Sequence, residues 1–498
     1  MESITIIIKR NGILKKYNVP NNITVLEALN YINCNYGENI QYRASCKSGQ
    51  CGSCAMTINN EPKLACKTKV ENNMIVEPLE GFNIIEDLII DRSPYYKKIQ
   101  SIKNHLQYDE DKMDVGNLNI TPNDLKKFKK VRNCIDCLCC LSKCPAKNFS
   151  EYPGPTIIRQ LARFAFDPRD EVEREKEAYF ENLYNCTTCG KCVEVCPKEI
   201  DIVHNAIERL RELSFKKGYY INNHLVVREN ILKGNRSITK DKLPLLEDKS
   251  IMEEYIVEEE KMRLAFFTGC LIDYRLQEVG KSAIRVLNAH GISLIIPKNQ
   301  VCCGSPLLRT GQRDVAEKLK KHNLKLFNKL DVDGVVTLCA GCGSTLKNDY
   351  KEREFNVMDI TQVLDTIGPL KYKPLEVKVT YHDPCHLRRG QGVYKEPRKI
   401  LKKIPKLKFV EMEIPDQCCG AGGGVRSGKP EISMAIGMRK ARMIYNADVD
   451  YVITVCPFCE YHIKDSLDKF LNENMENKRK NLKNIEVMNI VSLLDRVI

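Results

Sequence analysis

Cysteine is the residue type in this sequence whose number and spacing point to chemistry. The chain has 24 cysteines among 498 residues, and 22 of them fall into five sets. Clustered thiolates are ligands for soft metals. A secreted protein that paired so many cysteines as disulfides would be short, and the start of this sequence lacks the pattern of an export signal. The cysteines therefore predict metal-bound thiolates in a reducing, cytoplasmic environment.

The first set has the spacing C-x4-C-x2-C followed by a more distant cysteine. It consists of Cys46, Cys51, Cys54 and Cys66. This spacing is typical of plant-type two-iron ferredoxins. Small residues such as Gly49 and Gly52 lie between the cysteines and allow backbone N–H groups to point at sulfur. Zinc loops favour C-x2-C pairs, so a zinc site is the weaker alternative.

The second and third sets share the spacing C-x2-C-x2-C-x3-C-P of bacterial ferredoxins. In such pairs of runs, the fourth cysteine of each run ligates the cluster of the other. One four-iron cluster is therefore expected on Cys134, Cys137, Cys140 and Cys196. The other is expected on Cys186, Cys189, Cys192 and Cys144.

The fourth and fifth sets each contain five cysteines, including one adjacent pair. They are Cys270, Cys302, Cys303, Cys339 and Cys342, and Cys385, Cys418, Cys419, Cys456 and Cys459. Five thiolates exceed what one cubane cluster or one zinc ion needs. Adjacent cysteines cannot easily ligate the same metal atom, so each adjacent pair suggests two irons bridged at one loop. Spacing alone predicts a soft-metal site in each set, and these ten cysteines are the candidates for catalysis.

The first three cysteine sets lie in segments with different predicted secondary structure. Residues 1–92 alternate in a β pattern, with strands expected at 4–8, 17–20, 55–58 and 74–76 and a helix at 24–31. This arrangement predicts a small β-grasp domain. Residues 93–215 are predicted to be an α-helical domain, with a helix start at Thr121-Pro122. Residues 216–262 are polar and irregular and are predicted to be a linker that holds some helix.

Residues 263–498 contain an internal repeat. Each cysteine of the fourth set corresponds to one of the fifth set at a distance of 115 to 117 residues. A period this long predicts two homologous lobes, 263–376 and 377–498, rather than a solenoid. Each lobe alternates apolar strands with helices, such as one at 314–326, and places cysteines at strand ends. The expected fold class is therefore multidomain α+β, ending in a duplicated α/β domain.

Charge and hydropathy exclude some partners. The formal net charge is +13, but clusters ligated by thiolates carry negative charge that offsets much of this excess. The basic run at 126–130 is interpreted as a solvated face or as a docking surface for an acidic partner, and no nucleic-acid partner is expected. No apolar stretch approaches the 18 or more residues of a spanning helix, so no intrinsic membrane span is expected.

Residues 1–215 resemble the iron–sulfur subunit of succinate dehydrogenase and fumarate reductase. The resemblance rests on the first three cysteine sets and on the segments 154–159 and 167–170 between the ferredoxin runs. Many members of that family lack the middle cysteine of the last run and hold a three-iron cluster there. Because Cys189 is present, the resemblance implies a complete four-iron cluster in this chain.

The last two sets resemble the CCG domain of the catalytic subunit of heterodisulfide reductase. This resemblance implies a further, non-cubane four-iron cluster in each lobe, with a disulfide substrate acting between them. The fusion of both halves is similar to the B subunit of thiol:fumarate reductase of methanogens. That family implies oxidation of the small-molecule thiols coenzyme M and coenzyme B, with electrons passed to an FAD flavoprotein that reduces fumarate. The chain itself has no flavin fingerprint.

Two other functions remain open at this stage. One is a quinone-linked succinate dehydrogenase or fumarate reductase subunit, and the other is a pure electron carrier or redox-sensing protein. Cys34 and Cys139 lie outside the sets, and Cys34 is expected to be a small buried hydrophobic residue. His382 and His386 flank Cys385. For both histidines, packing or helix capping is favoured over proton transfer.

Overall fold

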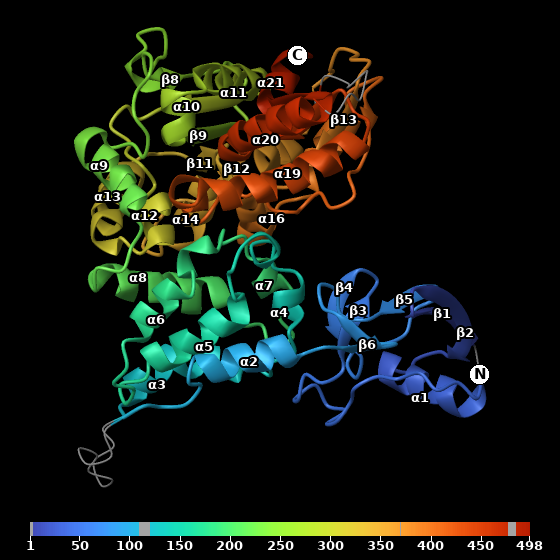
Figure 1. Cartoon of the computed structure of the whole chain (residues 1–498). Coiled ribbons are helices and arrows are strands. Elements are labelled where there is room, and N and C mark those ends of the chain that lie inside the picture. The colour runs from blue at the N-terminus through green and yellow to red at the C-terminus, as the bar shows by residue number, and fades with distance from the viewer. Residues whose placement is uncertain (1–2, 109–119, 369, 477–484) are drawn as a thin grey trace. The chain divides into compact units, whose positions relative to one another are not determined.

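The computed structural model describes residues 3–108, 120–368, 370–476 and 485–498. Its contacts divide the chain into two units (Figure 1). The first unit is Met1–Cys186 with Gly190–Tyr219, and the second is Thr187–Cys189 with Tyr220–Ile498. The finer domain bounds at residues 92, 215, 262 and 376 remain predictions.

The first unit begins with a mixed five-stranded sheet in the order β2-β1-β5-β3-β4. Its strands are β1 (Ser3–Arg10), β2 (Ile13–Pro20), β3 (Ala55–Ile58), β4 (Glu61–Leu64) and β5 (Met74–Glu77). The four predicted strands are present. β4 was not predicted, because Pro62 and the charged residues beside it hide the β alternation. A separate two-stranded ribbon consists of β6 (Ile84–Glu86) and β7 (Ile89–Ile90).

The helix of this sheet, α1 (Val25–Asn35), starts at a capping box. The Thr24 hydroxyl accepts a hydrogen bond from the Glu27 backbone N–H, and the Glu27 carboxylate accepts one from the Thr24 N–H. The helix runs four residues beyond its predicted end. The prediction that Cys34 is buried was wrong, because the extended helix places Cys34 off the buried stripe that ends at Ile32.

The remainder of the first unit is helical. Its helices are α2 (Ser93–Ser101), α3 (Pro122–Lys129), α4 (Cys139–Ser142), α5 (Pro155–Ala165), α6 (Arg174–Phe180), α7 (Lys191–Glu194) and α8 (Glu208–Lys216). The predicted start at Thr121-Pro122 is confirmed, since Thr121 caps α3 and Pro122 is its first residue. Short 3-10 turns, η2 (Val131–Asn133) and η4 (Leu183–Asn185), precede the two ferredoxin runs.

The second unit contains two sheets with the same strand order. The sheet of the first lobe (263–376) is β12-β11-β9-β10, extended by a short antiparallel β8, and that of the second lobe (377–498) is β16-β15-β13-β14. The strands are β8 (Glu254–Tyr255), β9 (Met262–Phe267), β10 (Ile292–Ile295), β11 (Gly334–Thr337), β12 (Val357–Asp359), β13 (Lys378–Tyr381), β14 (Lys408–Phe409), β15 (Tyr451–Thr454) and β16 (Glu486–Asn489). The four equivalent strands are parallel within each lobe.

Helices connect these parallel strands, as crossover connections require. They are α10 (Gly269–Tyr274), α11 (Gln277–Ala289), α12 (Ser305–Thr310), α13 (Arg313–Phe327), α14 (Ala340–Asn348), α15 (Ile360–Ile367), α16 (Cys385–Gln391), α17 (Glu396–Lys402), α18 (Val425–Gly428), α19 (Pro430–Asn446), α20 (Pro457–Glu476) and α21 (Ile490–Asp495). The helix predicted at 314–326 is confirmed as α13. One hydrophobic cluster includes strand residues of both lobes, such as Phe266 and Val452, so the lobes share a core.

The predicted linker holds one regular helix, α9 (Asn222–Gly234), which ends at Asn235 in the left-handed conformation. Among the helices of the described ranges, none has the length and apolar character needed to cross a membrane.

Candidate iron–sulfur sites

In the first set, backbone N–H groups point at a cysteine sulfur. Cys46 Sγ accepts hydrogen bonds from the N–H groups of Ser48 (3.4 Å), Gln50 (3.2 Å) and Cys51 (3.3 Å). These bonds, led by the one from Ser48, lower the pKa of Cys46 to about 5. Stabilisation of the thiolate by N–H donors is what iron ligation requires. The small, turn-forming residues identified in the sequence make this loop possible.

Gly52 brings the first set against the second set. Its φ is 68°, and a Cβ there would lie 2.5 Å from the Ile135 carbonyl oxygen and 2.9 Å from Cys137 Cα. Only glycine fits such a close backbone approach. Cys54 and Cys66 are buried in the same cluster as Cys137. The loops of the two sets are therefore packed together within the first unit.

Four cysteines from two different runs line one small cavity in the first unit. Cys134, Cys137, Cys140 and Cys196 are its cysteines, and Thr156 and Ile200 also line it. These are the four cysteines that the crossed pattern of ferredoxin runs predicts. Burial raises the pKa of Cys134 to about 11 and also raises that of Cys140. A thiolate in this apolar place needs a bound cation beside it, which fits an iron cluster.

Three members of the other predicted set surround a buried tyrosine. Burial raises the pKa of Tyr152, and thiolate charge at Cys186, Cys144 and Cys192 adds to the effect. The remaining member, Cys189, is grouped with the second unit, where it packs with two cysteines of the fifth set. The structure thus brings three of the four together in the first unit.

The two ferredoxin runs repeat each other in backbone geometry. Asp136 and Leu138 of one run have φ values of 47° and 67°, and Thr188 and Gly190, at the same places in the other, have 51° and 74°. Left-handed residues at these places turn the loop, and the Asp136 N–H donates to Cys134 Sγ at 3.4 Å.

Two buried arginines, which the residue types alone did not identify, anchor these runs. Arg159 donates to the Val131 carbonyl at 3.0 Å, and Arg211 donates to the equivalent Leu183 carbonyl at 2.9 Å. Each carbonyl lies three residues before the first cysteine of its run. Arg211 also donates to the Cys186 carbonyl at 2.8 Å. Their positive charge lies where thiolate charge collects.

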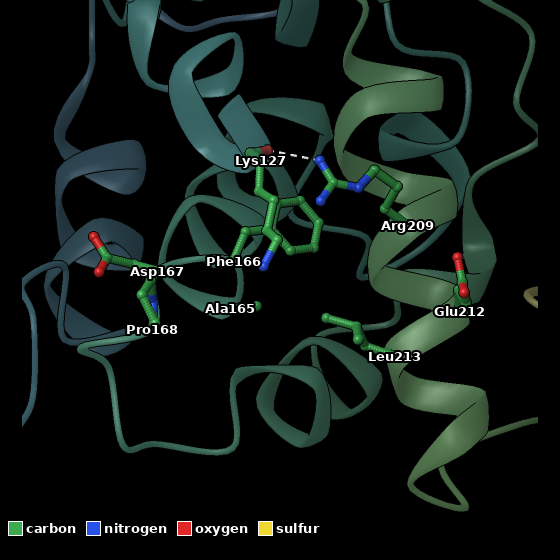
Figure 2. Close-up of a pocket in the computed structure, with 8 residues that line it drawn as sticks. All are labelled: Lys127, Ala165, Phe166, Asp167, Pro168, Arg209, Glu212 and Leu213. Carbon is green, nitrogen blue, oxygen red and sulfur yellow. Dashed lines mark hydrogen bonds between the residues drawn. The ribbon is translucent and has the colours of Figure 1, made fainter. Parts of the chain in front are cut away.

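The first unit also has a pocket of about 380 Å³ away from the cysteines (Figure 2). It is lined by Lys127, Ala165, Phe166, Asp167, Pro168, Arg209, Glu212 and Leu213. The Arg209 guanidinium lies 4.0 Å from the centroid of the Phe166 ring and donates to the Lys127 carbonyl at 2.6 Å. These contacts hold α3 and α8 together, which is a structural role.

In the second unit, cysteines follow the two central strands of each sheet. Cys270 and Cys339 follow β9 and β11, and Cys385 and Cys456 follow β13 and β15. Among the four equivalent parallel strands of each lobe, these are the first and third in sequence, and they lie side by side. The connections that leave two such neighbouring strands run to opposite faces of the sheet. Ligands of open α/β sheets bind at this place, beyond the carboxyl ends of the two strands.

Each lobe pairs the second cysteine of its adjacent doublet with its last cysteine. Cys303 Sγ lies 3.4 Å from Cys342 Sγ, and Cys419 Sγ lies 3.5 Å from Cys459 Sγ. Two thiolates on one tetrahedral metal, with metal–sulfur bonds of about 2.3 Å, would stand about 3.8 Å apart. The sulfurs of both pairs are therefore close to the spacing of two ligands on one iron, and the distance is nearly the same in the two lobes.

The cysteine sets of the two lobes meet. The Cys339 thiol of the first lobe and Cys456 of the second lobe lie close enough for each to shift the pKa of the other. Contacts from Cys339 and Cys459 hold the pKa of Cys456 well below its usual range. The two five-cysteine sets thus form one continuous region inside the second unit.

Comparison with known proteins agrees with this division of the chain. A model of the 2Fe-2S iron–sulfur cluster binding domain matches residues 8–97, and one of the 4Fe-4S dicluster domain matches residues 130–200. A model of the cysteine-rich CCG domain matches twice, at residues 264–347 and 379–464. Its double match corresponds to the internal repeat.

Relatives show the same fusion. An uncharacterized iron–sulfur protein of Methanococcus maripaludis is 67% identical over 100% of both chains. The B subunit of fumarate reductase (CoM/CoB) of Methanothermobacter marburgensis is 46% identical over 97% of this chain and 95% of its own. This chain belongs to the same family as that B subunit. The D subunit of dihydromethanophenazine:CoB–CoM heterodisulfide reductase of Methanosarcina barkeri is 33% identical over 67% of this chain and 88% of its own.

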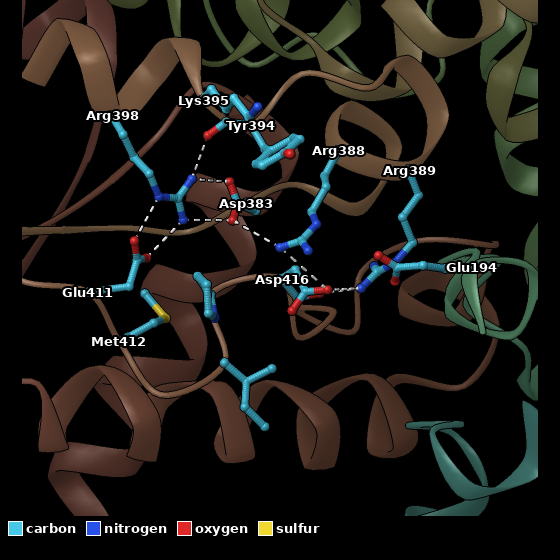
Figure 3. Close-up of polar contacts among 12 residues, drawn as sticks. Glu194, Asp383, Arg388, Arg389, Tyr394, Lys395, Arg398, Glu411, Met412 and Asp416 are labelled. Atoms are coloured by element: carbon cyan, nitrogen blue, oxygen red, sulfur yellow. Dashed lines mark hydrogen bonds and ion pairs between the residues drawn. The ribbon is translucent and has the colours of Figure 1, made fainter. Parts of the chain in front are cut away.

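In this member of the fumarate reductase (CoM/CoB) family, the second lobe contains a network of paired charges (Figure 3). Arg398 donates to both carboxylate oxygens of Asp383, at 2.9 and 2.8 Å. Arg388 lies 3.8 Å from both Asp383 and Asp416, and Arg389 donates to the Asp416 carboxylate. Asp383 and Asp416 are buried, and pairing is what makes buried carboxylates tolerable.

His382 and Lys440 complete this environment. Burial lowers the pKa of His382 to about 3 and that of Lys440 to about 8. His382 caps no helix of the described chain, so the capping role expected from the sequence was wrong: α16 begins three residues later and is preceded by Pro384. Packing alone does not explain His382 either, since both its ring nitrogens lack a partner.

Proposed function

We propose that this chain is the iron–sulfur subunit of a thiol:fumarate reductase. It oxidises coenzyme M and coenzyme B to their heterodisulfide and delivers the electrons to an FAD flavoprotein that reduces fumarate to succinate. Two thiols lose two protons and two electrons as one S–S bond forms. Fumarate takes up two protons and two electrons on the partner, so the reaction balances.

The meeting of two complete five-cysteine sets at Cys339 and Cys456 carries this proposal. A disulfide joins its sulfurs at about 2.05 Å, so two thiols must be brought next to each other to be oxidised together. Two adjoining thiol-binding metal centres accomplish this, whereas a simple electron carrier needs only one path of clusters. The named relative that couples fumarate reductase with CoM and CoB supports the same substrates.

The predicted ligand sets fit five clusters. The proposal assigns a two-iron cluster to Cys46, Cys51, Cys54 and Cys66 in a β-grasp domain. It assigns cubane four-iron clusters to Cys134, Cys137, Cys140 and Cys196 and to Cys186, Cys189, Cys192 and Cys144, and one further four-iron cluster to each lobe. The clusters, when bound, supply one-electron redox chemistry. The anaerobic protein should then contain about 18 irons.

The flavoprotein is proposed to dock on the first 92 residues. This part of the chain exposes large apolar side chains: Ile84 and Ile85 on β6 are 53% and 66% exposed, and Ile13 at the start of β2 is 72% exposed. Exposed apolar groups of this kind are typical of interaction surfaces. The two-iron site lies in the same part of the chain.

The test is thiol-dependent fumarate reduction by the anaerobically purified complex. Cys303→Ala and Cys419→Ala should each abolish it, while fumarate reduction with an artificial dye should survive, because the dye bypasses the lobes. Cys51→Ala should also stop thiol-to-fumarate transfer. Cys34→Ala, at an exposed cysteine outside every set, is the matched control and should leave both activities unchanged.

Full thiol-dependent activity in both lobe variants would contradict the proposal. Activity with a quinol but not with thiols would instead identify a quinone-linked subunit, and activity with neither would favour an electron carrier.

A further inference from the structure

His382 occupies a place in the second lobe that distinguishes it from the first. It follows β13 directly and lies three residues before Cys385, as Phe267 lies three residues before Cys270. Both side chains are buried, with His382 1% and Phe267 0% exposed. The repeat therefore places an imidazole in one lobe where the other has a phenyl ring.

The His382 ring is polar and buried, yet neither nitrogen has a hydrogen-bond partner in the structure. Leaving a buried polar group unsatisfied is unfavourable, so such a group normally has a partner. The backbone around it is satisfied, since the His382 N–H donates to the Ile453 carbonyl at 2.9 Å. The side chain thus lacks a partner in a place where the fold holds it firmly.

Two cysteine thiols lie near the unpaired imidazole of His382. A His382 ring nitrogen and the sulfurs of Cys419 and Cys459 all lie within 4.8 Å of one another. The two sulfurs are 3.5 Å apart, which is close to the separation of about 3.8 Å expected of two thiolates on one tetrahedral metal. Of the described residues, this is the one group of three potential metal ligands drawn together so closely.

The other buried histidine near this site has partners of its own. His462 contacts Arg426 through Nδ1 and the Ser433 carbonyl through Nε2, at 3.2 Å for the latter. Its imidazole is therefore engaged by the protein, whereas that of His382 is available to a metal.

We propose that His382 supplies a nitrogen ligand to the iron–sulfur centre of the second lobe, beside Cys419 and Cys459, and that the first lobe lacks this ligand because Phe267 stands in its place. The inference rests on the proposed cluster of the second lobe. The reduction potential of an iron–sulfur centre depends on its ligands and on the hydrogen bonds around it. An imidazole present in only one lobe would therefore give the two centres unequal potentials.

The test is electron paramagnetic resonance with nitrogen hyperfine spectroscopy on full-length anaerobic protein labelled with ¹⁵N only in histidine. The signal of the second-lobe centre is identified as the one lost in Cys459→Ser. It should show the strong ¹⁵N coupling of an iron-bound imidazole. His382→Phe, which copies the first lobe, should remove this coupling and change the midpoint potential of that centre.

His462→Gln is the matched control and should keep the ¹⁵N coupling. The labelled wild-type protein is informative even where a variant fails to assemble, because the ¹⁵N coupling of an iron-bound imidazole can be measured without any substitution. A second-lobe signal with no ¹⁵N coupling, or only the weak coupling of a hydrogen-bonded ring, would overturn the assignment of His382 and leave the proposed function intact. Absence of iron from the second lobe would contradict the proposed function itself.

Discussion

The two CCG lobes share a strand order and a cysteine pattern but differ in the polar groups behind the cysteines. In the first lobe, the Gln300 side-chain oxygen accepts a hydrogen bond from the Thr268 N–H at 2.9 Å. The equivalent residues of the second lobe are Asp416 and Asp383, and both are paired with arginines. A neutral amide link in one lobe is thus a charged network in the other.

The helix that follows in each lobe shows the same difference, with a neutral side chain in the first lobe and a charged one in the second. Asn323 of α13 donates to the Val301 and Cys302 carbonyls, both at 3.2 Å. Lys440, at the same place on α19, donates to the Ile414 and Pro415 carbonyls at 2.7 and 3.2 Å. Both side chains tie a helix to the loop before the adjacent cysteines. The duplication has therefore kept the ligand geometry and changed the electrostatics, which is a means of tuning two otherwise similar centres.

The largest difference should follow from removing the equivalent carboxylate and amide. Asp416→Ala removes a carboxylate that pairs with Arg389, which is 8% exposed, and breaking a buried pair costs about 3–5 kcal/mol. Gln300→Ala removes neutral hydrogen bonds, which costs about 1–3 kcal/mol. Anaerobic thermal unfolding should show the lower melting temperature for Asp416→Ala. Equal losses in the two variants would mean that the charged network adds no stability beyond ordinary hydrogen bonds.

A smaller difference is expected at the glycine that follows each cysteine doublet. Gly420 has φ 101°, and a Cβ there would lie 2.4 Å from the Ser433 carbonyl oxygen, which is part of the backbone. Gly304 has φ 83°, but its nearest contact would be an ordinary 3.5 Å. Gly304→Ala should cost about 1 kcal/mol from backbone strain, and Gly420→Ala about 3 kcal/mol because overpacking is added.

Urea unfolding of the two glycine variants under identical anaerobic conditions measures this difference. Gly368, which has φ 92° and open space around its Cβ position, is the control for backbone strain alone. If Gly420→Ala is no less stable than Gly368→Ala, the close approach to Ser433 is not a constraint on the second lobe.

Much of the fold was predictable from the sequence because its signals are local. The spacing of cysteines predicted the ferredoxin and CCG parts, and Thr121 with Pro122 predicted the start of α3. The helix α9 was foreseen only as unspecified helix in a linker, since no side chain caps its start. Cys34 was misjudged because the end of α1 has no strong stop signal, and the helix extends to Asn35.

The environment of the cysteines was less predictable, since it depends on residues distant in sequence. The sequence identified His382 only as a neighbour of Cys385, and its approach to Cys419 and Cys459 arises from the packing of separate loops. The pairing of Asp383 with Arg398 likewise joins a strand end to a helix. The ligand assignments of all five sets remain proposals that the metal measurements above would test.

The smallest expected effect is the pH dependence contributed by one buried histidine of the first lobe. His290, at the end of α11, is 1% exposed and contacts the Val286 carbonyl at 2.6 Å and the Tyr372 hydroxyl at 3.2 Å. Burial lowers its pKa below the usual 6.5. The second lobe has no histidine between α17 and β14.

The direction of the effect follows from proton binding. Below pH 6.5 the unfolded chain binds a proton at His290 that the folded chain resists, so the free energy of unfolding falls as the pH is lowered through this range. The loss is at most about 1.4 kcal/mol per pH unit. The glutamine of His290→Gln cannot titrate but can still form hydrogen bonds. The free energy of unfolding of this variant, relative to that of the wild type, should therefore increase as the pH is lowered from 7.5 to 5.5. Urea unfolding at both pH values measures this, with the exposed His322→Gln as the matched control. A stability difference between wild type and His290→Gln that stays constant with pH would show that the buried imidazole is protonated as readily in the folded lobe as in the unfolded chain.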